Sequence, residues 1–195
     1  KRTNKESGIL LKQSYGREKD WEEHFQYLLL FFKDERYIRL DGKPVFVIYK
    51  PSKIHSFWSM KNFFDKLAKN NGLSGIYIIG MEADWNIGLD AVCIRQPYYA
   101  MAESEKKKFI LQLQSLTTYS YDELWEVIQR KQSNLEPTYL CGFVDYDDSP
   151  RKGKEGSVVS GSSPEKFYSS FKKLYEKSLM LGREFIFVNA WNEWG

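Results

Sequence analysis

The sequence predicts an α/β fold, and within that class a TIM-type (β/α)8 barrel to which this chain supplies the later strands and helices. Apolar runs of strand length alternate with amphipathic helical segments, which is the pattern of a parallel sheet wrapped by helices. The runs Val45–Tyr49 and Phe185–Val188 are continuously apolar, as strands covered on both faces require. Polar side chains follow the strand ends, which share one face in a barrel.

The first half of the chain is predicted to contain two helices. One begins near Asp20, because Asp20 and Glu23 imitate a capping box. The second spans 60–71 and stops at Gly72. The predicted strands of this half are Ile9–Leu11, Val45–Tyr49, Gly75–Gly80 and Ala91–Ile94.

The second half continues the alternation. A helix carries Lys106–Lys108 on a solvated face, and Ser120 with Glu123 forms a capping box for the next helix. Strand Thr138–Val144 follows, then a glycine- and serine-rich stretch, 153–163, which is interpreted as a lid or surface loop. The last helix is predicted to be capped by Ser163, to open with Pro164 and to end at Gly182. Its inward face is predicted to hold Phe167, Phe171, Leu174 and Tyr175, and a final buried strand begins at Phe185.

Composition narrows the function classes. The net charge of +3 is too small to indicate nucleic-acid binding. No apolar run approaches the roughly 18 residues of a membrane span, and the polar start lacks a signal core, so a cytoplasmic protein is expected. Cys93 and Cys141 are interpreted as buried apolar residues, because no metal-site or disulfide spacing surrounds them. We expect neither a metal nor a cofactor.

The strand count is too low for a complete barrel. Six strands at most cannot close an eight-stranded sheet, so residues 1–195 are expected to form one partial barrel domain, cut at both ends. Its open sheet edges need the missing part of the barrel, or self-association, to cover them. An open dinucleotide-binding sheet is the alternative, weakened because no glycine-rich turn follows the first strand.

The final stretch carries the strongest functional signal. The apolar run from Phe185 leads within a few residues into Trp191, Asn192, Glu193 and Trp194. An unpaired buried carboxylate is costly, so a core strand has no use for this pattern. A sugar site does, because indoles stack on pyranose faces while amide and carboxylate groups bind hydroxyls. The alternative is a solvated glutamate beside packing tryptophans.

Other strand ends supply further candidates for substrate contact. The aspartate-rich turn after the strand 138–144 can bind substrate hydroxyls or form a self-contained salt-bridged turn. A calcium site there remains an alternative, although the spacing matches no known calcium loop. The candidates outside the final stretch are Tyr49, Glu82, Tyr146, Asp147 and Arg151.

Three segments resemble one family in the right order. They are residues 24–51 (HFQYLLLFFKDERYIRLDGKPVFVIYKP), 143–151 (FVDYDDSPR) and 185–195 (FIFVNAWNEWG). These resemble the WbsX-type glycosyltransferases, also described as a glycoside hydrolase family 99-like group. The resemblance implies a (β/α)8 carbohydrate-active enzyme of polysaccharide or lipopolysaccharide biosynthesis, acting on a glycan or activated sugar.

The resemblance also implies a mechanism. In related endo-α-mannosidases two glutamates three residues apart act as base and acid, and Glu193 matches the first of them. The second falls at position 196, beyond this chain, so residues 1–195 alone are expected to be inactive. Asp148 and Tyr146 replace the usual asparagine and tryptophan. Glycosyl transfer and retaining hydrolysis both remain open, and the alternative function is a non-catalytic glycan-binding or scaffolding domain.

Overall fold

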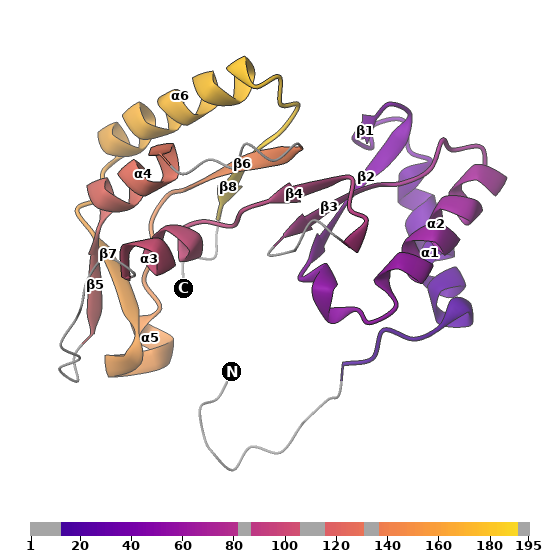
Figure 1. The fold of residues 1–195 in the computed structure, drawn as a ribbon, viewed down its shortest axis with the longest axis horizontal. Coiled ribbons are helices and arrows are strands. Elements are labelled where there is room, and N and C mark those ends of the chain that lie inside the picture. Colours follow the sequence, from indigo (N-terminus) through magenta and orange to yellow (C-terminus); the bar gives the residue numbers. More distant parts are fainter. Residues whose placement is uncertain (1–12, 82–86, 106–115, 131–136, 191–195) are drawn as a thin grey trace, which may run out of the picture. The chain divides into compact units, whose positions relative to one another are not determined.

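The computed structural model describes residues 13–81, 87–105, 116–130 and 137–190 (Figure 1). The chain divides into two compact units. The first contains the residues up to 46 together with 51–78, and the second contains 47–50 together with the residues from 79 onward. The predicted strand Ile9–Leu11 and the cationic segment Lys106–Lys108 lie outside the described residues.

In the first unit two helices pack through aromatic side chains. Helix α1 spans Glu18–Phe32 and helix α2 spans Phe57–Asn70, after the short 3-10 helix η1, Pro51–Lys53. The rings of Phe25 and Phe64 meet edge to face with centroids 5.6 Å apart, and both side chains are buried. These aromatic contacts bury large apolar areas and give the unit its core.

The start of α1 differs from its prediction. The helix begins at Glu18, and Asp20 is its third residue, where its carboxylate accepts a hydrogen bond of 2.8 Å from the Arg17 N–H. The predicted box of Asp20 with Glu23 is therefore wrong by one turn. The physical role is similar, because a carboxylate in the first turn satisfies an N–H that has no helical partner.

A hairpin leads out of α1. Strands β1 (Arg39–Leu40) and β2 (Lys43–Tyr49) pair antiparallel through a turn in which Asp41 and Gly42 both have positive φ. This is the aspartate–glycine turn that favours hairpins. These two are the first strands of a six-stranded sheet.

The second unit contains the parallel part of the sheet. Strand β3 spans Tyr77–Met81 and β4 spans Ala91–Cys93, while β6 spans Thr138–Phe143 and β8 spans Ile186–Asn189. The pairs β3–β4, β4–β6 and β6–β8 are all parallel. Parallel strands joined by helices establish an α/β fold.

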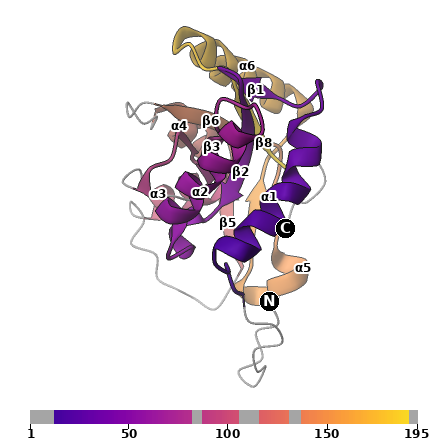
Figure 2. The same cartoon turned by 90° about the vertical axis from the view of Figure 1, so that its right-hand side faces the viewer.

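Helices of this unit cover the sheet. Helix α3 spans Tyr98–Glu105, α4 spans Tyr121–Arg130 and α6 spans Pro164–Met180. Figures 1 and 2 show α4 and α6 beside β6, and both helices contribute to a core that includes buried Trp125, Phe143 and Leu174. Among the described residues, no helix combines the length and apolar character that crossing a bilayer requires.

The segment predicted as a loop is partly regular. Within the predicted stretch 153–163, Gly153–Glu155 form the 3-10 helix η3 and Ser157–Ser160 form strand β7, and Ser149–Lys152 form helix α5 directly before it. Strand β7 pairs parallel with β5, Thr117–Ser120, in a second small sheet. Periodicity cannot reveal these elements, because each is four residues or fewer.

Three burial predictions are also wrong. Tyr175 is 47% exposed, because the core face of α6 passes through Leu174 and Ser178 and Tyr175 lies about 100° away from Leu174 around the helix. Val47 in β2 is 40% exposed and Val188 in β8 is 42% exposed. Neither strand is therefore covered on both faces by the described residues.

Candidate functional site

Polar and aromatic side chains follow the carboxyl ends of four strands of the second unit. Lys50 follows β2, Arg95 follows β4, the turn beginning at Asp145 follows β6, and Asn189 ends β8. The end of β2 is bonded to the end of β3, where the Lys50 N–H donates to the Met81 carbonyl over 2.9 Å. The carboxyl edge of a parallel sheet is where α/β proteins bind ligands.

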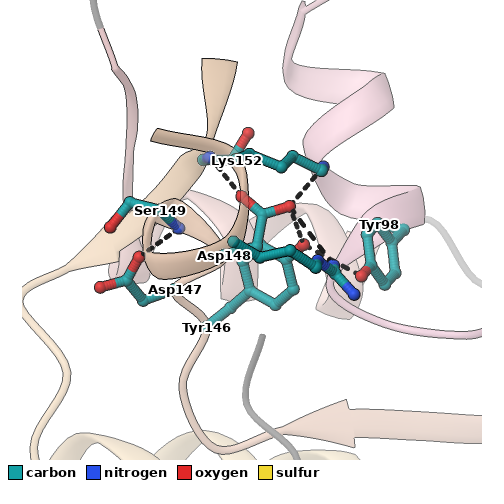
Figure 3. A network of polar contacts seen from close by, with 8 residues as sticks. Tyr98, Tyr146, Asp147, Asp148, Ser149 and Lys152 are labelled. Carbon is teal, nitrogen blue, oxygen red and sulfur yellow. Dashed lines mark hydrogen bonds and ion pairs between the residues drawn. The ribbon is translucent and has the colours of Figure 1, made fainter. Parts of the chain in front are cut away.

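The aspartate-rich turn is built around one buried carboxylate (Figure 3). Asp148 is fully buried, forms an ion pair with Lys152, and accepts hydrogen bonds from the Ser157 N–H at 2.6 Å and the Tyr146 hydroxyl at 2.8 Å. The Arg151 guanidinium lies 3.9 Å from the same Asp148 carboxylate. These partners satisfy the carboxylate oxygens, so Asp148 organises the turn.

Protonation states follow from these contacts. Burial by itself raises the pKa of the Asp148 carboxyl, but the ion pair with Lys152 and the bonds from Ser157 and Tyr146 outweigh it, so the pKa lies below its ordinary value. Burial, Tyr98 and Asp148 raise the pKa of Tyr146 above its ordinary value. At neutral pH Asp148 is therefore an anion, and Tyr146 is a neutral donor.

The other two aspartates of the turn have separate partners. Asp145 accepts from the Tyr146 N–H at 2.8 Å and from the Ser162 hydroxyl at 2.9 Å. Asp147 accepts from the Ser149 N–H at 2.8 Å, which is visible in Figure 3. In the part of the chain that the structure describes, no three acidic, histidine or cysteine side chains are grouped to hold a metal ion. The contacts favour the self-contained turn over a calcium loop.

A row of side-chain contacts, most of them aromatic, connects the aspartate-rich turn to the end of β2. The Tyr98 hydroxyl donates to the Tyr146 hydroxyl over 2.9 Å, and the two rings meet edge to face. The Arg95 guanidinium lies over both the Tyr98 ring, at 4.6 Å from its centroid, and the Tyr49 ring, at 5.5 Å. Arg95 also donates to the Tyr49 hydroxyl over 3.2 Å. Predicted residues Tyr49 and Tyr146 thus belong to one network.

A further contact joins the ends of β4 and β8. The Asn189 side chain donates to the Gln96 carbonyl over 2.6 Å, and the Gln96 side chain accepts from the Ala100 N–H at the start of α3. Both cysteines of the neighbouring strands, Cys93 and Cys141, are free and buried, which confirms their interpretation as apolar core residues.

The structure describes only some of the predicted site residues. It brings Tyr49, Tyr146 and Arg151 into the network, and it places Asp147 in the same turn. Sequence reasoning missed Arg95 and Tyr98, although Arg95 directly follows a buried apolar run as the other candidates do. Five predicted residues lie outside the described residues: Glu82, Trp191, Asn192, Glu193 and Trp194.

The fold and this network define a class: an α/β protein with a charged and aromatic cluster at the carboxyl ends of its parallel strands. The family model described as "Glycosyltransferase WbsX" matches residues 1–195. The chain therefore belongs to the WbsX glycosyltransferase family.

Two curated relatives are similar to the chain. Both are described as "Uncharacterized protein WxcX", from two strains of Xanthomonas campestris pv. campestris, and they are 19% identical over 196 residues and 22% identical over 201 residues. Each match covers 95% of this chain but 28% of the relative, so the chain spans little more than a quarter of their length. No solved structure gives a significant match.

Proposed function

We propose that the chain is part of a (β/α)8 enzyme that acts at glycosidic bonds during polysaccharide or lipopolysaccharide synthesis. The observation that carries this proposal is the gathering of Tyr49, Arg95, Tyr98 and the aspartate-rich turn at the carboxyl ends of parallel strands. That edge is the active face of a barrel. Membership of a glycosyltransferase family supports sugar chemistry there, with transfer favoured over hydrolysis.

Glu193 is the proposed catalytic carboxylate. It follows Asn189 by four residues, and Asn189 is the point at which β8 ends and is tied to the end of β4. Cleaving or forming a glycosidic bond develops positive charge at the anomeric carbon and moves a proton on or off the bridging oxygen. One ionised carboxylate and one proton donor are needed, and Glu193 supplies the first.

The remaining candidates are proposed to bind the sugar. Trp191 and Trp194 offer indole faces for pyranose C–H groups, and Tyr49, whose side chain is exposed, offers a third ring. Asn192 and Glu82 are proposed to bind sugar hydroxyls. Asp147 and Arg151 are exposed on the aspartate-rich turn and can do the same, while Tyr146 holds that turn from within.

The decisive experiment replaces Glu193 in the full-length protein. Glu193→Gln keeps the size of the side chain but removes its charge, so turnover should fall by about 10²- to 10⁴-fold while glycan binding persists. Glu176→Gln, an exposed position on α6, is the matched control and should leave turnover unchanged. Undiminished turnover in Glu193→Gln would remove this residue from the mechanism. Loss of glycan binding by Glu193→Gln, without an effect on turnover, would favour a glycan-binding domain.

A further inference from the structure

We propose that Asn189 is a positioning residue, whose side chain fixes the end of β8 from which the chain continues to Glu193. Its effect on catalysis rests on the proposed function, whereas the contact itself rests on the geometry of the second unit. The Asn189 side-chain N–H donates to the main-chain carbonyl of Gln96 over 2.6 Å. Asn189 ends β8 and Gln96 follows β4, and β6 lies between those two strands in the sheet. The bond therefore joins the ends of two strands that are not neighbours.

The side chain of Gln96 leaves its main-chain carbonyl to Asn189. At the start of α3, the N–H groups on either side of Ala100 donate to main-chain carbonyls four residues back, as in a regular helix. The Ala100 N–H donates to the side-chain oxygen of Gln96 over 3.2 Å. Gln96 is buried, so this bond also fixes the carbonyl that receives Asn189.

The sulfur of Cys141, in β6, joins the same strand ends. The Cys93 thiol and the backbone N–H groups of Gln96 and Asn189 hydrogen-bond to this sulfur. These bonds lower the pKa of the Cys141 thiol against the opposing effect of burial. Asn189 is therefore held at the meeting point of β4, β6 and β8 through both its backbone and its side chain.

Strand formation alone does not account for an asparagine at this position. Strand β8 is already paired with β6, where Phe143 is the register partner of Asn189, and asparagine is among the residues that strands disfavour. Its side chain restrains the point at which β8 ends, four residues before Glu193. Reacting groups need this restraint, because a displacement of about 1 Å can lower a rate by about 10²-fold.

Steady-state kinetics of the full-length protein test this role, with the substrate used for Glu193→Gln. Asn189→Asp keeps the shape of the side chain but replaces the donating N–H group by an acceptor. Gln96→Met keeps the length of the side chain but removes its oxygen, so the Ala100 N–H competes with Asn189 for the main-chain carbonyl. Each variant should lower kcat by about 10- to 100-fold while KM changes by less than about threefold. Asn62→Asp, which changes an exposed asparagine of α2, is the matched control and should keep both constants.

Two further measurements show whether the bond between Asn189 and Gln96 is responsible. Because both substitutions break the same bond, the double variant should lose no more kcat than the more impaired single variant. Amide hydrogen exchange of residues 186–190, which needs no substrate, should rise about fivefold in both single variants, since each loses a hydrogen bond at the end of β8. Losses of kcat that multiply in the double variant, or unchanged exchange in both single variants, overturn the proposal.

The outcomes separate this role from the assignment of Glu193. A wild-type kcat in Asn189→Asp, or a loss that only follows the loss of folded protein, overturns the positioning role and leaves Glu193 untouched. A raised KM with unchanged kcat also overturns it, because Asn189 would then contribute to binding. An active Glu193→Gln beside an impaired Asn189→Asp removes Glu193 from the mechanism and supports the positioning role. Should Asn189→Asp fail to fold, Gln96→Met and Asn189→Ser, whose shorter side chain lacks the reach to Gln96, decide the question.

Discussion

Asp148 is a buried anion whose partners come from three different parts of the second unit. Lys152 lies on the following helix, Ser157 begins β7, and Tyr146 connects the turn to Tyr98. Removing the carboxylate takes its acceptor from the Ser157 N–H and leaves the buried Tyr146 hydroxyl with Tyr98 as its partner, which is more costly than losing the ion pair to the partly exposed lysine. The turn therefore depends on an oxygen acceptor at position 148 more than on a charge.

Two substitutions separate these contributions. Asp148→Ala should lower the free energy of unfolding by about 2–3 kcal/mol, whereas Asp148→Asn, which keeps one oxygen acceptor, should lose about 1 kcal/mol. Chemical denaturation measures both. Asp147→Asn, which changes an exposed carboxylate in the same turn, is the control and should lie within about 0.5 kcal/mol of the wild type.

The difference in stability between the wild type and Asp148→Asn is expected to depend on pH. The folded-state pKa of Asp148 is lowered, so its contribution is fully present above the unfolded-state pKa of about 4 and is lost as the pH falls through the folded-state pKa. The wild type should therefore lose more stability than Asp148→Asn on acidification below about pH 4. Parallel acid limbs in the two proteins would show that the carboxylate is not stabilised as an anion.

At the scale of elements, packing around strand β6 explains why it contains a glycine. A Cβ on Gly142 would lie 2.8 Å from the Trp125 ring, with Phe171 and Leu174 also within contact. The indole stacks on Phe143 of the same strand, with ring centroids 5.6 Å apart. Helices α4 and α6 therefore approach β6 closely only because position 142 has no side chain.

Gly142→Ala should destabilise the second unit by about 1–3 kcal/mol, since a methyl group forced into a packed core displaces its neighbours. Thermal unfolding measures the loss. The double variant with Trp125→Phe provides the control, because the smaller ring leaves room for the methyl group. The cost of Gly142→Ala should shrink in that background. An equal cost in both backgrounds would place the strain elsewhere than at the indole.

Elements differ in how well the sequence predicts them. Helices α2, α4 and α6 were predictable because apolar spacing and caps agree: Ser120 and Ser163 accept bonds from the N–H groups of Glu123 and Lys166, as expected. Strands β5 and β7 and helix α5 were not, because short polar segments acquire structure only from their neighbours. The site divides in the same way. The positions of Tyr49 and Tyr146 after predicted strands follow from the sequence, whereas the contacts of Arg95 with Tyr49 and Tyr98 depend on tertiary structure.

At the scale of the whole molecule, helix α6 and strand β8 of the second unit both have apolar side chains that the described residues leave uncovered. Helix α6 meets α4 through Lys166, Ser170 and Lys177. Tyr168, Tyr175 and Leu179 are spaced 7 and 11 residues along α6, so they share the opposite flank, and all three are exposed. Strand β8 has a described neighbour on one side only, and its Val188 is exposed.

This flank is where a further strand and helix of a barrel would pack, so we expect it to be buried in the longer protein. Residues 1–195 alone should then self-associate through the edge of β8, and Val188→Lys should reduce that association, as charged edge residues do. In the longer protein the same substitution should instead lower stability by about 2 kcal/mol or more, because it places a charge in a covered apolar contact. Light scattering measures the first effect and thermal unfolding the second. Leu30→Lys, which changes an exposed residue of α1, is the control and should change neither the self-association nor the stability. If the longer protein tolerates Val188→Lys without loss of stability, this flank faces solvent.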